Sequence, residues 1–211
     1  MDTSQTELLD RVEAWARELL ERDGAAAHGW PHVARVRRLA RVLAPPEGVE
    51  PWLAECAALL HDVGRALPGP ESEHGQRSAE LAAPLLAGLL PAERPAAAAE
   101  RDEILYAVRW HNSTRDDTRL LCVLRDADML DGMGAVGLVR ALTSKADLPP
   151  YDERGVCLGT AYARPPRSIA DQINFQLDWI GFLNTETARE LARERIAFMR
   201  AFVEQWQREL L

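Results

Sequence analysis

The chain has 211 residues, of which 47% are hydrophobic and 27% charged, as in one ordinary globular domain, and this excludes a mainly disordered chain. Cys56, Cys122 and Cys157 have neither paired nor metal-ligating spacing, which excludes a disulfide scaffold and predicts buried thiols in a reducing compartment. The net charge of −8 argues against nucleic acid as the main partner, and the absence of a long apolar run predicts no membrane span and a cytoplasmic protein.

Apolar residues recur at helical spacing along most of the chain. They predict amphipathic helices at residues 4–22, from Pro31 to the Pro45-Pro46 pair, and from Pro51 to about Gly64. Within the third helix the stretch WLAECAALL is apolar almost all round, so we expect it at the centre of the fold. Further helices are expected at 76–89, 97–110, 118–130 and 131–144, with a kink near Gly132 and Gly134.

The last third of the chain begins with an irregular stretch. Residues 146–168 have no helical period and are longer than a usual connector, so they form either a lid over a site or a solvent-exposed loop. Two closing helices are expected within about 168–209, at 168–182 and 185–209, and Asn184 or Thr185 caps the second. Since no alternating strand pattern and no repeat occurs, the predicted fold class is all-α, in a single domain of residues 1–211.

The pair His61-Asp62 ends the apolar third helix. Burying an imidazole beside a carboxylate costs free energy unless another group compensates both. A divalent cation does so, because it accepts a nitrogen lone pair and an anionic oxygen. An isolated pair of this kind is more often a histidine at a helix end beside a solvated aspartate. The apolar stretch that precedes the pair and the polar residues described next favour a metal site.

The other histidines are His28, His32, His74 and His111, so all five precede residue 112. His32 falls in the first turn of the second helix, and His28 lies four residues earlier. His74 begins a helix and His111 follows one. Each of them alone is more often a satisfied core or surface histidine, but their concentration in one half of the chain favours a shared site.

Three aspartates, Asp126, Asp128 and Asp131, lie in the motif DADMLD. Acids within an apolar helix need a partner, and Asp131 shares a helix face with Asp128. We expect one aspartate to bind a metal while another orients a ligand histidine or a water; the plainer reading is a capping acid and a surface acid. Together the histidines and aspartates offer nitrogen and oxygen ligands without a thiolate, which suits Mn, Fe, Co, Ni or Mg better than a structural zinc site.

These motifs resemble the HD-domain superfamily of metal-dependent phosphohydrolases, and among them the stand-alone bacterial HD hydrolases of about this length. The resemblance rests on an ordered set that spans about residues 23–140: AHGWPHVARV, HDVG, HGQRS, RWHNS and DADMLDGMGAVGLVR. The tail TARELARERIAFMRAFVEQW also looks like that subgroup. An HD pair alone is a weak signal, whereas the ordered set is specific.

The resemblance implies a single HD domain, a helical bundle with a metal at its centre. It implies four metal ligands: His32, His61, Asp62 and Asp128. In family members that bind two metals, the histidines that correspond to His74 and His111 join the ligands and Asp62 bridges the ions. In one-metal members the same histidines face the phosphate.

One position departs from the family pattern, which usually has a basic residue where this chain has Met129. A charge that contacts phosphate or braces a helix is therefore missing, which bears on the substrate more than on the metal. Arg65, Arg77 or Lys145 could supply a positive charge, since they lie near the motifs in the sequence.

The resemblance also implies an activity: hydrolysis of nucleotides, or of another small phosphate ester or anhydride, by a metal-activated water. A bound metal lowers the pKa of water from about 16 to about 7. Asp62 or a nearby acid would accept the water's proton, and His74, His111 or His28 would contact the phosphate or protonate the leaving oxygen. We expect one or two ions of Mn, Mg, Co, Ni or Fe, and a monomer or a homodimer.

Two other functions fit the same residues. Some HD-fold enzymes use two iron ions and oxygen to cleave C–C or C–P bonds, and this chain has histidines and aspartates enough for six ligands. A non-catalytic module that senses a nucleotide is the second alternative. Oxygen-dependent turnover would favour the first, and tight nucleotide binding without hydrolysis would favour the second.

Overall fold

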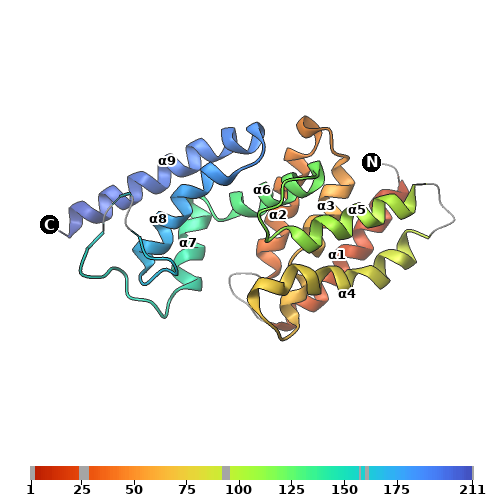
Figure 1. The fold of residues 1–211 in the computed structure, drawn as a ribbon, viewed down its shortest axis with the longest axis horizontal. Coiled ribbons are helices and arrows are strands. Elements are labelled where there is room, and N and C mark those ends of the chain that lie inside the picture. The colour runs from red at the N-terminus through yellow and green to blue at the C-terminus, as the bar shows by residue number, and fades with distance from the viewer. Residues whose placement is uncertain (1–2, 24–28, 92–95, 157, 160–161, 211) are drawn as a thin grey trace. The chain divides into compact units, whose positions relative to one another are not determined.

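The computed structural model describes residues 3–23, 29–91, 96–156, 158–159 and 162–210 (Figure 1). Over these residues the chain is all-α and contains no β-strand, apart from one isolated bridge between Asp152 and Gly155. The predicted fold class is therefore confirmed. Among the described helices, none combines the length and the apolar character needed to cross a membrane.

The chain divides into two compact units, Met1–Asp128 and Met129–Leu211. Within its described residues, the first unit holds five complete helices and most of a sixth: α1 (Thr3–Asp23), α2 (Trp30–Leu43), α3 (Pro51–Leu60), α4 (His74–Leu89), α5 (Ala97–Trp110) and α6 (Arg119–Asp131). The second unit holds α7 (Gly134–Ser144), α8 (Ile169–Leu177) and α9 (Glu186–Glu209). Short 3-10 turns complete the chain: Pro45–Glu47, Val63–Ala66, Glu71–Glu73 and Asp178–Phe182. The assignment of the whole chain to one domain stays a prediction.

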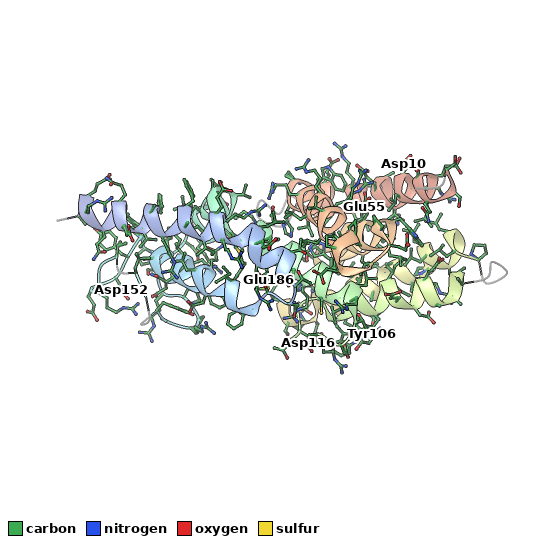
Figure 2. The ribbon with its side chains drawn as sticks, turned by 90° about the horizontal axis from the view of Figure 1, so that it is seen from above. Asp10, Glu55, Tyr106, Asp116, Asp152 and Glu186 are labelled. Carbon is green, nitrogen blue, oxygen red and sulfur yellow. The ribbon has the colours of Figure 1, made fainter. Side chains whose placement is uncertain are left out.

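Helix α3 forms the core of the first unit, as its sequence predicts. Every residue from Trp52 to Leu60 is buried, and the helix packs against α1, α2 and α5. Glu55 is the charged residue within this stretch, and Figure 2 marks its position. A helix that is surrounded on all sides fixes the position of the residues that follow it, which are His61 and Asp62.

The end of α3 differs from the prediction. The α-helix ends at Leu60 rather than near Gly64, and Val63–Ala66 continues as a 3-10 turn. Asp62 leaves the helical conformation, with φ −105° and ψ 2°. The pair His61-Asp62 therefore lies at a change of direction, where adjacent side chains can reach one centre although they would diverge by about 100° on a regular helix.

Two glycines allow close contact between the segments around this centre. A Cβ atom on Gly64 would lie 2.4 Å from the backbone nitrogen of Ser78, and one on Gly75 would lie 2.7 Å from the carbonyl oxygen of Arg109. Both distances are shorter than side chains tolerate. The turn after α3 can therefore pack tightly on α4, and α4 on α5, only because these residues lack a side chain.

The second unit is built from α7, α8 and α9, which pack against one another. The predicted kink near Gly132 is a complete break, because α6 ends at Asp131 and α7 begins at Gly134 with φ +74°. The hydroxyl of Thr185 accepts a hydrogen bond from the backbone N–H of Ala188, so Thr185 is the cap of α9.

The segment that precedes α8 contains no helix within its described residues. Hydrogen bonds join this segment to α8 through the buried carboxylate of Asp171. That carboxylate accepts them from the backbone N–H groups of Ala163 and Arg167 and from the guanidinium of Arg154. Its predicted role as a lid stays a prediction.

The described cysteines fit the expectation of buried thiols. Cys56 and Cys122 are buried and unbridged, and burial raises the pKa of Cys56 to about 12. Cys157 lies outside the described residues. At Cys56 a raised pKa suppresses the thiolate, so this residue acts as a small core side chain.

Candidate metal centre

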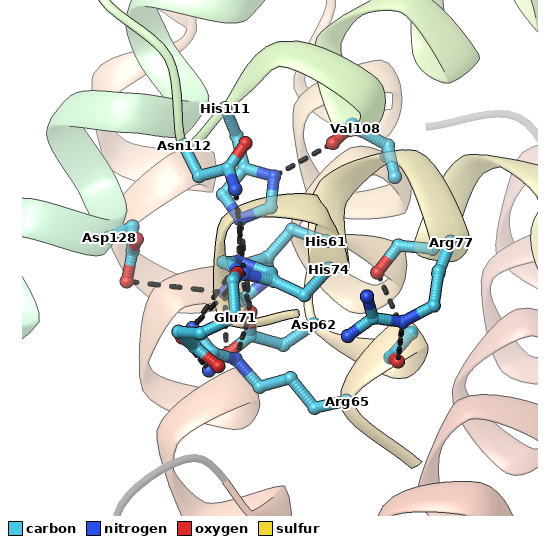
Figure 3. A network of polar contacts seen from close by, with 12 residues as sticks. His61, Asp62, Arg65, Glu71, His74, Arg77, Val108, His111, Asn112 and Asp128 are labelled. Atoms are coloured by element: carbon cyan, nitrogen blue, oxygen red, sulfur yellow. Dashed lines mark hydrogen bonds and ion pairs between the residues drawn. The ribbon is translucent and has the colours of Figure 1, made fainter. Parts of the chain in front are cut away.

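Segments that lie far apart in the sequence bring histidine and aspartate side chains together in the first unit. His61 and Asp62 follow α3 directly, His74 is the first residue of α4, and His111 follows α5. His32 lies in the first turn of α2 and Asp128 near the end of α6. Figure 3 shows the network around His61, Asp62, His74, His111 and Asp128. Except for Asp128, whose side chain is 34% exposed, these residues are buried.

One half of the centre gathers around one oxygen of Asp62. The Nε2 atoms of His32 and His61 lie 3.3 Å apart, and they lie 3.5 Å and 3.6 Å from Asp62 Oδ2. Asp128 Oδ1 lies 3.3 Å from His32 Nε2 and 4.0 Å from His61 Nε2. We call these four ligand atoms the first half of the centre.

The other half gathers around the second oxygen of the same carboxylate. His74 Nε2 and His111 Nε2 lie 3.0 Å apart, and they lie 3.3 Å and 3.8 Å from Asp62 Oδ1. We call these three ligand atoms the second half. Asp62 thus directs its two oxygens toward two different pairs of imidazole rings.

Three of the imidazole rings are oriented by the backbone. The Nδ1 atoms of His61, His74 and His111 lie 2.7, 2.6 and 2.7 Å from the carbonyl oxygens three residues earlier in the chain. A carbonyl oxygen only accepts hydrogen bonds, so each Nδ1 carries the proton. In a neutral ring, Nε2 then presents its lone pair to the centre, which is the arrangement that metal-binding histidines require.

Burial favours the neutral form of two of these rings, those of His61 and His74. Desolvation lowers the pKa of His61 to about 4, although the nearby carboxylates of Asp62 and Asp128 act in the opposite direction. Burial also lowers the pKa of His74. At neutral pH, His61 therefore carries no proton on Nε2.

This donor set fits a divalent cation. With Nδ1 protonated, the Nε2 atoms of His74 and His111 face each other at 3.0 Å as two lone pairs, a contact that is repulsive unless a cation or a proton lies between them. Three groups of three ligand atoms lie within 4.8 Å of one another: His32, His61 and Asp62; His61, His111 and Asp128; Asp62, His74 and His111. Nitrogen and oxygen ligands without sulfur suit Mn, Fe, Co, Ni or Mg.

Arg65 adds a positive charge to the second half. Its Nε lies 2.8 Å from Asp62 Oδ1, one terminal nitrogen lies 3.3 Å from His74 Nε2, and the other pairs with Glu71. Of the three basic residues considered from the sequence, Arg77 instead bonds to the carbonyl oxygens of Gly64 and Pro70.

The remaining predicted residues lie as follows. Asp126 is buried on α6, two residues before Asp128, so helix geometry turns it about 200° away from that residue. Asp131 and Lys145 belong to the second unit. The carboxylate of Asp131 accepts a hydrogen bond of 2.9 Å from Arg140. Their roles beside a metal stay predictions. His28 lies outside the described residues.

Sequence analysis did not identify the groups that orient the centre. The carbonyl oxygens of Ala58, Glu71 and Val108 hold the three rings. A signal was present, because His61 and His111 each come directly after a helix, where a side chain can turn back to a carbonyl of the preceding turn. For the ion pair between Arg65 and Asp62, the only indication in the sequence was that the two residues lie three positions apart.

Comparisons with known proteins give a family match and a relative of similar length. Residues 29–133, which contain all six candidate ligands, match the HD domain family. The chain is 27% identical over 209 residues to the YpgQ protein of Bacillus subtilis, with 95% of this chain and 93% of YpgQ covered.

Solved structures share the fold over nearly the whole chain. A protein of Lactobacillus plantarum has a TM-score of 0.73 and 28% identity, with 100% of this chain and 98% of that chain covered. YpgQ in complex with ADP has a TM-score of 0.72 and 25% identity, with coverage of 98% and 97%. A predicted HD superfamily hydrolase from an uncultured Thermotogales bacterium has a TM-score of 0.66 and 26% identity, with both chains fully covered.

Proposed function

Since this chain belongs to the HD-domain superfamily, we propose that it is a divalent-metal-dependent phosphohydrolase that acts on nucleotides or another small phosphate ester or anhydride. The observation that carries the proposal is the convergence of Nε2 atoms and carboxylate oxygens on a common centre. Four residues would hold the first ion: His32, His61, Asp62 and Asp128. His74 and His111, with the second oxygen of Asp62, would hold a second ion.

A divalent ion bound here would supply a water of lowered pKa and would polarise a phosphoryl oxygen. The rest of the chemistry belongs to the chain's own residues. Asp62 is proposed to accept a proton from the attacking water, because its two oxygens face both halves of the centre. His74, His111 or His28 would contact the phosphate or protonate the leaving oxygen.

Arg65 takes the role that the family pattern gives to a basic residue near the second aspartate of DADMLD, where this chain has Met129. Its side chain is only 15% exposed, and its guanidinium already lies beside Asp62 and His74. A phosphate that enters the second half would meet this positive charge. Arginine suits the task because its planar fork matches phosphate oxygens.

Nucleotides are the proposed substrate class because YpgQ, a relative over nearly the whole chain, has been solved in complex with ADP. That complex supports a nucleotide as the kind of ligand to test. It does not define which bond is cut, so the substrate screen must include phosphomonoesters, nucleoside diphosphates and nucleoside triphosphates.

The test is elemental analysis of the purified chain, followed by a phosphatase and nucleotide screen with Mn, Mg, Co and Ni. We expect a bound divalent metal and metal-dependent release of phosphate or pyrophosphate without oxygen. Asp62→Ala should abolish both, whereas Asp147→Ala, which removes an exposed carboxylate, should keep both. Full activity in metal-free protein would reject the proposal. Oxygen-dependent turnover with iron would instead support the oxygenase, and binding without turnover would support the nucleotide-sensing module.

A further inference from the structure

A pocket lined by charged residues lies in the first unit, on the opposite side of α2 from His32. It has a volume of about 310 Å³, within the range of small-molecule sites. Its polar and aromatic lining comes from α1, α2 and α3: Glu13, Trp30, Arg37, Arg38, Arg41 and Glu55. The three arginines follow His32 by five, six and nine residues, which places them about 140–240° around the helix from His32. The pocket is therefore separate from the metal centre.

Glu55 lines this pocket, and one oxygen of its buried carboxylate has no hydrogen-bond donor among the described residues. The residue is 1% exposed, and its Oε2 accepts a hydrogen bond of 2.8 Å from Arg37 Nε. Within the described structure, Oε1 has no hydrogen-bond partner, and Arg41 Nε lies 3.8 Å away, beyond hydrogen-bonding distance. A buried carboxylate oxygen without a donor costs free energy, so an occupant of this pocket gains by donating a hydrogen bond to it.

The charges around Glu55 are unequal. Arg37 bonds to both Glu13 and Glu55, so one guanidinium lies between two carboxylates. Arg38 and Arg41 add two positive charges at the mouth, where the Arg41 side chain is 63% exposed. Three arginines against two glutamates leave the lining with a net charge of +1, although the whole chain carries −8. The mouth of the pocket therefore attracts an anion.

Trp30 gives the pocket a flat apolar wall. It is the first residue of α2 and is half-buried, and the guanidinium of Arg17 lies 5.6 Å from its ring centre. A tryptophan ring offers a large rigid surface against which a sugar or a planar ring can pack. The pocket thus offers two guanidinium groups, a buried hydrogen-bond acceptor and an aromatic surface. These groups suit a ligand in which an anionic group is joined to a ring that carries a hydrogen-bond donor.

We propose that this pocket is a binding site for a small organic phosphate that carries a hydroxyl or N–H donor. The phosphate group binds Arg38 and Arg41, because two guanidinium groups match a dianionic phosphate through charge-assisted hydrogen bonds. The donor group bonds to Glu55 Oε1, and the ring of the ligand packs on Trp30. The site is independent of the proposed hydrolysis, since none of its residues faces the metal centre.

The test is calorimetric titration of the full-length, metal-loaded chain with ribose 5-phosphate, AMP and inorganic phosphate. Arg38 and Arg41 are exposed, so the double variant Arg38→Ala/Arg41→Ala should fold normally. The matched control is Arg200→Ala/Arg208→Ala, which removes two exposed charges from α9. We expect the double variant to bind the phosphate esters about 10–100-fold more weakly than wild type, the control to bind them as wild type does, and turnover to be unchanged in both.

A second variant tests the role of the buried oxygen. Glu55→Gln should weaken binding of ribose 5-phosphate or AMP about tenfold, whereas inorganic phosphate should bind at least as tightly because a negative charge is removed. Thermal melting checks that the variant folds. The tighter of the two esters shows whether a sugar or a base packs on Trp30. Ester binding that is equal in wild type and in Arg38→Ala/Arg41→Ala would overturn the proposal, because it would assign all binding to the metal centre. Since binding is measured directly, this result is independent of whether the chain hydrolyses anything.

Discussion

The two halves of the metal centre share Asp62 but differ in how their negative charge is compensated. In the first half, Asp62 Oδ2, Asp128 Oδ1 and the Nε2 atoms of His32 and His61 converge. In the second half, Asp62 Oδ1 and the lone pairs of His74 and His111 are accompanied by the guanidinium of Arg65. Both contacts of Arg65 with the described ligand atoms, to Asp62 Oδ1 and to His74 Nε2, are in the second half.

This difference indicates how the halves divide their work. The first half combines two carboxylates with two imidazole nitrogens, and Arg65 contacts the other oxygen of Asp62, so an external cation would complete this half. The second half already has a cation, which an incoming ion must displace from Asp62 Oδ1 and His74 Nε2. We therefore expect the first half to bind a metal more tightly, and the second half to exchange between Arg65, a metal and a phosphate.

Removing the shared carboxylate should have the largest effect. Asp62→Ala takes one ligand from each half, so we expect loss of bound metal and a fall in turnover of about a thousandfold or more. Elemental analysis and a phosphate-release assay measure the two effects. Asp147→Ala controls for the loss of a carboxylate. Retention of metal by Asp62→Ala would show that the halves do not depend on this residue.

Removing one histidine from each half should separate their roles. His32→Ala should lose both the tightly bound ion and turnover. His74→Ala should keep one ion and lose about 10–100-fold in turnover, because the first half stays complete. Metal stoichiometry by titration with Mn, together with kcat and KM, distinguishes the two variants. The same loss of metal in both would contradict the division into unequal halves.

Replacing the guanidinium should change the second half alone. Arg65→Met keeps a long side chain but removes the charge beside Asp62 and His74. We expect a second ion to bind about tenfold more tightly and KM for a phosphorylated substrate to rise about tenfold. Calorimetric titration with Mn and steady-state kinetics test these two changes. Weaker binding of the second ion would show that Arg65 supports the metal site instead of competing for it.

The smallest effect concerns the packing that holds His74 near His111. Gly75→Ala forces a Cβ atom to within 2.7 Å of the Arg109 carbonyl, so we expect the free energy of unfolding to fall by about 1–3 kcal/mol. Gly88→Ala on the same helix meets nothing within 4 Å and should raise it by about 0.5–1 kcal/mol. Urea unfolding with a chelator present measures both variants. Equal stabilities would contradict the role of Gly75.

Sequence periodicity predicted the helices well because it reports local preference. The predicted helices at 4–22, 97–110 and 185–209 match α1, α5 and α9 within one residue at each end. The apolar stretch before His61 predicted the buried position of α3, and this is confirmed. These features depend on which face of each helix is apolar, and that information lies in neighbouring residues.

The details of the site depend on contacts between distant segments, which periodicity does not report. The early end of α3 at Leu60 and the contact of Arg65 with His74 require the turn after α3 to pack on α4. Glu55 shows the same limit. It interrupts WLAECAALL as a visible charge, but its partner Arg37 lies 18 residues earlier, on α2.

The most direct test of the metal centre is a stoichiometric titration of chelator-stripped wild-type chain with Mn, followed at each addition by phosphate release. The account predicts that one equivalent binds tightly, that turnover appears with this equivalent, and that a second ion binds more weakly. Phosphate release at full rate before any metal is added, or two ions of equal affinity, would contradict the account.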